Sequence, residues 1–156
     1  MTRMRWWGNR PGWARWLAAV YVVGFLEGTG AHAYFLAAGG LDAYDYAPAP
    51  VRLLFHGLLL LDPLAAVLIV RGRPAGPLVC GAVMFSDVVA NWWVQWSDVL
   101  ARPAAHLRPV GLLPITLFGV LVLATALPLR RVLTSTAVTG EDERRRTAPA
   151  RSRSVR

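Results

Sequence analysis

Four long apolar stretches, separated by short segments rich in Pro, Gly and Arg, constrain this chain more than any other feature. Hydrophobic residues make up 55% of the 156 residues, whereas a soluble domain usually holds about 45–50%. A helix needs about 20 mostly apolar residues to cross a bilayer. The pattern therefore predicts an all-α integral membrane protein, a four-helix bundle with transmembrane spans at residues 17–38, 51–70, 77–98 and 110–130.

The spans divide the chain into three parts. Residues 1–16 form a basic and aromatic N-terminal segment, and residues 17–131 form the transmembrane domain. Residues 132–156 are polar and rich in Arg, with too few apolar side chains to offset the entropy of ordering. This tail is therefore predicted to be disordered.

The arginines indicate how the spans are oriented. All 17 basic residues are Arg, which is typical of a GC-rich bacterial genome. Only Arg52, Arg102 and Arg108 lie on the side of the predicted outer connections, and the other fourteen lie at the opposite ends of the spans. Because basic segments stay in the cytoplasm, both termini are predicted to be cytoplasmic in a multi-pass protein of the bacterial plasma membrane. The net charge of +8 then reflects topology, so membrane lipids and not nucleic acid are the expected partners.

The first span admits a second interpretation. Its basic start, the apolar run 17–26 and the A-x-A motif at residues 31–33 resemble a signal peptide, whose cleavage would leave three spans. Glu27 close after the apolar run, and bulky Tyr34 and Phe35 after the motif, favour an intact span. Whether the motif is cleaved stays open.

Ionisable side chains in the first three spans are the candidates for function, because such groups are costly in a membrane and by default face the bundle interior. Glu27, Asp62 and Asp87 each lie roughly 16–18 Å from the outer boundary, at 1.5 Å per residue, and are candidate catalytic acids or bases. His32 and His56 share a level roughly 9 Å deep. The candidate ligand-binding residues are His32, His56, Asn91, Trp92 and Trp96.

Spacing relates some of these residues to one another. One stripe at i, i+4, i+7 and i+11 follows the third span: Cys80, Met84, Asp87 and Asn91. His56 and Asp62 are six residues apart and point about 120° from each other, so whether they share a site is open. Cys80, the sole cysteine, is predicted to be a small buried hydrophobe, and His106 in the last outer connection is predicted to be exposed.

Such a cluster suits several functions. Three carboxyls in a low dielectric cannot all ionise, so at least one is expected to stay protonated. The leading hypothesis is binding of a hydrophobic lipid or isoprenoid-like molecule, with acid–base isomerisation or cyclisation as its extension. Trp92 and Trp96 could then stabilise a carbocation by cation–π attraction.

Two alternatives stay open beside the ligand pocket. The polar groups could pair between helices in a non-catalytic accessory or assembly subunit, with a membrane-protein partner or as a homo-oligomer. They could also form a proton, metal or haem site through His32 and His56. No metal ligand set and no cofactor is predicted, since nothing such as a C-x-x-C-H motif supports haem, and the sequence leaves open whether the protein is an enzyme.

Short motifs stand at the polar positions of the second and third spans: Phe55-His56, Asp62-Pro63-Leu64, and Ser86-Asp87 with Asn91. With them, residues 15–130 resemble small four-span bacterial membrane proteins of unknown activity. The architecture is also similar in outline to the EXPERA proteins, which include sterol isomerases and sterol-binding receptors. That resemblance implies an intramembrane lipid pocket and carries over no site residue.

Overall fold

The computed structural model describes residues 7 and 10–147, and this part of the chain is all-α. The remaining residues of the predicted N-terminal segment and tail, 1–6, 8–9 and 148–156, lie outside the described residues. The described chain forms four helices: α1 (Gly12–Gly39), α2 (Ala49–Val70), α3 (Gly76–Ala101) and α4 (Leu112–Thr147). Two short 3₁₀ turns, η2 (Gly40–Asp42) and η3 (Pro103–His106), belong to the α1–α2 and α3–α4 connections.

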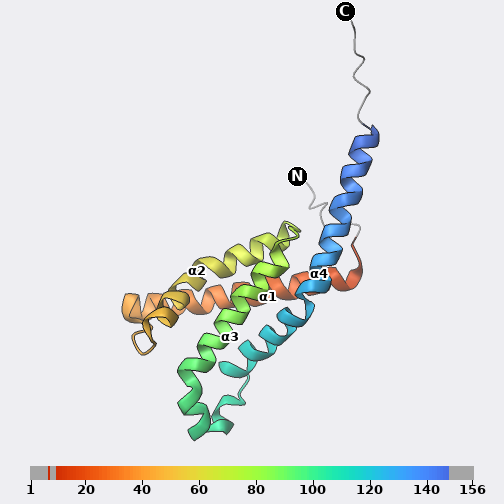
Figure 1. Cartoon of the computed structure of the whole chain (residues 1–156). Helices are drawn as coiled ribbons and strands as arrows, with labels where there is room; N and C mark the ends of the chain where they lie inside the picture. The colour runs from red at the N-terminus through yellow and green to blue at the C-terminus, as the bar shows by residue number, and fades with distance from the viewer. Residues whose placement is uncertain (1–6, 8–9, 148–156) are drawn as a thin grey trace, which may run out of the picture.

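Helices that follow one another in the chain pack against one another. Figure 1 shows α1 and α2 as one antiparallel pair and α3 and α4 as a second, with the two pairs crossing. α2 also packs on α3, whereas α1 and α4 meet only at a narrow crossing. At that crossing the Tyr21 hydroxyl donates to the carbonyl of Val122 at 2.8 Å, and the Phe118 ring lies against Gly24.

Within the described part of the chain, three helices are long and apolar enough to cross a membrane: α2, α3 and the Leu112–Ser135 part of α4. This finding indicates a multi-pass membrane protein. α1 is 28 residues long, but Glu27, Thr29 and His32 lower its mean hydropathy. Its role as a fourth span therefore stays a prediction.

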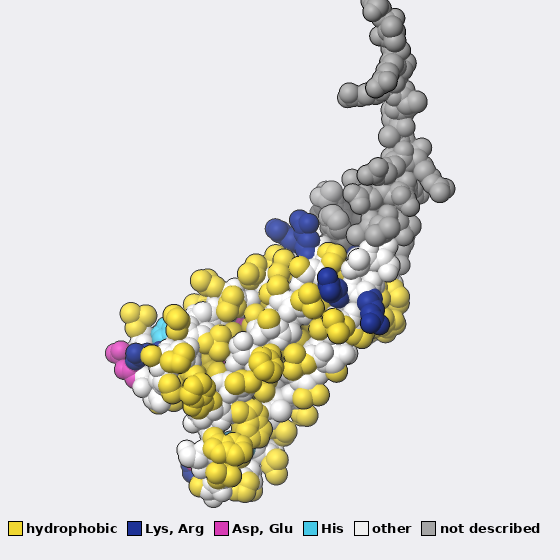
Figure 2. Space-filling model, viewed as in Figure 1, with side chains coloured by type: hydrophobic (Ala, Val, Ile, Leu, Met, Phe, Trp, Pro, Cys, Tyr) yellow, Lys and Arg dark blue, Asp and Glu magenta, His cyan; other side chains and the backbone are white. Residues whose placement is uncertain are grey.

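The surface of the helices is apolar between two polar ends. Large side chains such as Leu53 (75% exposed) and Leu60 (73% exposed) point away from the protein, as expected of residues that face lipid. Figure 2 shows the described arginines gathered mainly at the end near the grey tail, and acidic side chains and a histidine at the opposite end. The basic end corresponds to the predicted cytoplasmic side.

The helix boundaries differ most from the prediction in α4. The predicted fourth span ends at residue 130, but α4 continues to Thr147. Residues 132–147, which were predicted to be disordered, are therefore helical. The end of an apolar run predicts where the membrane-spanning part of a helix ends. It does not predict where the helix itself ends, because Arg and Glu are also good helix formers.

Candidate functional site

Asp62 is the one charged side chain that is buried among the described residues. It lies in α2 directly before Pro63 and is 5% exposed. Its carboxyl faces α1 at Gly28, where an added Cβ would lie 2.7 Å from Asp62 Oδ2. Gly28 therefore provides the space that the carboxyl occupies.

The Asp62 carboxyl receives no hydrogen bond from any residue that the structure describes. Among the described residues, the one other carboxyl whose charge acts on it is that of Asp87 on α3. No arginine in the described chain forms an ion pair with either aspartate. The next residue, Pro63, has no N–H, so the carbonyl of Leu59 also loses its helical donor. The Asp62 carboxyl and the Leu59 carbonyl are thus two hydrogen-bond acceptors that lack a donor from α2 itself.

Asp87 is paired within its own helix. The Asn91 side-chain amide donates to Asp87 Oδ1 at 2.9 Å and to the Asp87 carbonyl at 3.0 Å. Gln95, one turn further, donates to Asn91 Oδ1 at 3.2 Å. These three side chains form a polar ladder along one face of α3. On the same stripe Cys80 and Met84 are buried, so the predicted stripe and the predicted burial of Cys80 are confirmed.

Tyr44 contacts both His32 and His56 at the predicted outer end of the helices. It follows η2 in the connection before α2 and is 3% exposed. Its hydroxyl lies 2.9 Å from His32 Nδ1, and its ring centroid lies 5.3 Å from that of His56 and 5.2 Å from that of Phe55. Sequence reasoning assigned Tyr44 no role, because a residue in a connecting segment has no helical period that reveals where it points.

The protonation of Tyr44 follows from its surroundings. Burial, and then the negative charges of Tyr46 and Asp87, raise the pKa of Tyr44 to about 12. The phenol therefore keeps its proton at neutral pH and can donate it to His32 Nδ1. His56 Nδ1 lies 2.7 Å from the carbonyl oxygen of Arg52, which only accepts, so this nitrogen carries a proton and donates it to that carbonyl.

Glu27 lies apart from the other candidate acids. It is exposed on α1, although it was placed at the same depth as the two aspartates. The buried face of α1 carries Tyr21, Phe25 and the neighbouring Gly28. Glu27 follows Phe25 by two residues, a turn of about 200°, and therefore points away from the side of α1 on which Phe25 is buried.

Trp92 contacts α4, and Trp96 contacts Trp92. Trp92 Nε1 donates to Thr116 Oγ1 at 2.9 Å, and the ring of Trp96, which is 54% exposed, lies 6.1 Å from that of Trp92. They have no described hydrogen bond to the aspartates or histidines.

His106 is only 15% exposed at its side chain, contrary to the prediction, because it contacts Asp98 at 3.0 Å.

The described residues contain no group of three or more His, Cys, Asp or Glu side chains that could hold a metal ion. The rings of His32 and His56 both pack on Tyr44.

No family model matches this sequence, and no curated protein or solved structure matches it either. The site must therefore be interpreted from its own chemistry.

Proposed function

We propose that this chain is a four-span protein of the bacterial plasma membrane that binds a hydrophobic small molecule at Asp62. The observation that carries the proposal is the Asp62 carboxyl, which is 5% exposed and receives no hydrogen bond from a described residue. A buried polar group left without a partner costs about 1–3 kcal/mol. A ligand whose hydroxyl or amine donates to Asp62 removes this cost while its apolar body stays among the helices.

The topology in this proposal has α1 as the fourth span and both termini in the cytoplasm. The 28 residues of α1 rise roughly 42 Å, which exceeds a hydrocarbon core about 30 Å thick. Burial of Tyr21 and Phe25 ties the middle of α1 to the other helices. The asymmetric arginines support the orientation.

The second carboxyl extends the proposal to catalysis. Asp62 and Asp87 lie on facing helices and act on one another electrostatically. For a ligand with a carbon–carbon double bond, the protonated carboxyl adds a proton to one carbon of the double bond, and the other carboxylate removes a proton from the carbon next to the second carbon of that bond. The double bond moves and no proton is gained or lost. The outline similarity to the EXPERA proteins supports the same class of ligand, an isoprenoid or sterol-like alcohol.

Native mass spectrometry of the protein purified in detergent and incubated with a bacterial lipid extract tests the ligand site. Wild type is expected to keep a small apolar molecule, and Asp62→Leu is expected to lose it, because leucine removes the acceptor and retains the bulk. Asp42→Leu is the matched control, since Asp42 is an exposed carboxyl in η2. If Asp62→Leu keeps the same bound mass, Asp62 does not hold the ligand.

An accessory or assembly subunit is the second candidate function, and the pairing of the other polar groups favours it. Asp87, Asn91 and Gln95 form a closed ladder, and His32 bonds Tyr44. Hydrogen bonds between helices, such as the one from Trp92 of α3 to Thr116 of α4, hold a bundle together without any ligand. The same spectra distinguish the two functions, because a subunit would carry a second protein mass in fixed ratio and no small molecule.

A further inference from the structure

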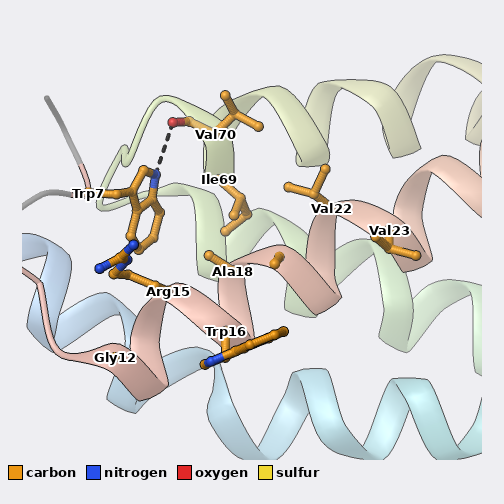
Figure 3. Close-up of a pocket in the computed structure, with 10 residues that line it drawn as sticks. Trp7, Gly12, Arg15, Trp16, Ala18, Val22, Val23, Ile69 and Val70 are labelled. Carbon is orange, nitrogen blue, oxygen red and sulfur yellow. Dashed lines mark hydrogen bonds between the residues drawn. The ribbon is translucent and has the colours of Figure 1, made fainter. Parts of the chain in front are cut away.

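A second concave surface lies at the opposite, basic end of the molecule, apart from Asp62. It is a groove of about 660 Å³ between the first half of α1 and the end of α2 (Figure 3). This volume falls within the roughly 300–1,000 Å³ that is usual for small-molecule sites. Trp7, Arg15 and Trp16 stand at its basic end, and Val22, Val23 and Val70 are among the apolar residues that line it.

Trp7 fixes one wall of the groove. Its Nε1 donates to the carbonyl of Val70 at 3.1 Å, as Figure 3 shows. That carbonyl has no helical donor, because the residue four positions further is Pro74, which has no N–H. The Arg10 guanidinium lies 5.0 Å from the centre of the Trp7 ring. The wall is thus built from defined contacts of the described chain.

The charge at the mouth of the groove is of one sign. Arg15 lines it, exposed Arg71 follows Val70 directly in the chain, and no Asp or Glu is among the lining residues. The first 26 residues of the sequence also contain no Asp or Glu. An anion is therefore the complementary partner at this end, while the valines and alanines deeper in the groove suit a hydrocarbon chain.

We propose that this groove binds an anionic phospholipid of the cytoplasmic leaflet. The phosphate contacts Arg15, which can donate two parallel hydrogen bonds to its oxygens. One acyl chain lies along the groove beside Val22 and Val23. The exposed ring of Trp16 lies at the level of the headgroup, where tryptophan is enriched in membrane proteins. The inference depends on the proposed cytoplasmic N-terminus and not on the ligand of Asp62.

The test is native mass spectrometry of protein released from nanodiscs that contain equal parts of phosphatidylglycerol and phosphatidylcholine. Wild type is expected to keep one phosphatidylglycerol. Arg15→Gln is expected to weaken its retention by about tenfold or more, the worth of a hydrogen bond between charged groups. Arg108→Gln, an exposed arginine in the connection before α4, is the matched control and is expected to behave as wild type.

The apolar part of the groove is tested by filling it. Ala19→Trp adds a large ring at an exposed lining position and is expected to lower the retention of phosphatidylglycerol. Val23→Phe, at a position 68% exposed, serves if the first variant does not fold. Equal retention of both lipids by wild type, equal loss in Arg15→Gln and Arg108→Gln, or full retention in a folded groove-filled variant would each overturn the proposal. Loss of phosphatidylglycerol with an unchanged ligand at Asp62 separates this site from the proposed function.

Discussion

Replacing Asp62 with leucine is expected to make the empty protein more stable while abolishing ligand binding. The carboxyl is 5% exposed and receives no hydrogen bond from a described residue, and the charge of Asp87 acts on it. Leucine has a branched end of similar shape, so it fills the same space opposite Gly28 without a polar atom. A buried carboxyl whose role is to bind a ligand is expected to lower the stability of the protein when no ligand is bound.

The size of the effect follows from two opposing contributions. Removing an unsatisfied buried polar group gains about 1–3 kcal/mol. The imperfect fit of two methyl groups opposite Gly28 costs up to about 1.5 kcal/mol, the usual limit for swaps that conserve volume. The first contribution is the larger, so a net gain of about 1 kcal/mol is expected. At roughly 2–4 °C per kcal/mol for a chain of this size, the Tm rises by a few degrees.

Thermal unfolding in detergent, without added lipid extract, measures this change. The 7 Trp residues provide a fluorescence signal. Asp42→Leu, at an exposed position, is the control and is expected to leave the Tm unchanged. A fall of several degrees in Asp62→Leu would refute the reasoning, since it would show that the carboxyl already has a stabilising partner and serves the packing of the helices.

Three further changes test the surroundings of Asp62. Gly28→Ala places a Cβ 2.7 Å from Asp62 Oδ2 and is expected to lower stability by about 1 kcal/mol and weaken ligand binding, as unfolding and mass spectrometry would show. Tyr44→Phe removes the bond to His32 and is expected to cost about 0.5–1.5 kcal/mol at neutral pH. Because the pKa of Tyr44 is raised to about 12 from an ordinary value of 10, wild type should also lose stability between pH 10 and 12, and Tyr44→Phe should lose less there in alkaline unfolding curves. Glu27→Gln is expected to leave ligand binding unchanged, since Glu27 is exposed on the far face of α1; lost binding would contradict this placement.

The positions of the helices could be predicted wherever apolar runs end at strong helix-stopping residues. The second predicted span, 51–70, agrees with α2 (Ala49–Val70), because prolines precede it and an Arg-Gly-Arg turn follows it. The end of α4 could not be predicted in this way. The hydropathy falls at Arg130, but the backbone hydrogen bonds of a helix do not depend on hydropathy.

The sequence predicts the depth of a side chain in the membrane better than it predicts the direction in which that side chain points from its helix. Depth follows from the rise per residue, and His32 and His56, placed at one level, both pack on Tyr44. Rotation must be taken from the buried stripe of each helix. The stripe of α3 is clear, but α1 is apolar on almost every side, so nothing in the sequence shows that Glu27 lies outside its buried face.

Tyr44 shows why the outer end of the site could not be predicted. It stands in a connecting segment, and its burial depends on the turn after Gly40, whose φ of 61° returns the chain over the ends of α1 and α2. Once buried, a tyrosine must find a partner for its hydroxyl, and His32 supplies it. The Tyr44 ring also packs between His32 of α1 and His56 of α2, so it fills the space between these helices at their outer ends. A hydrophobic ligand of Asp62 would therefore enter between the helices from the bilayer, which agrees with an apolar molecule and not with a water-soluble one.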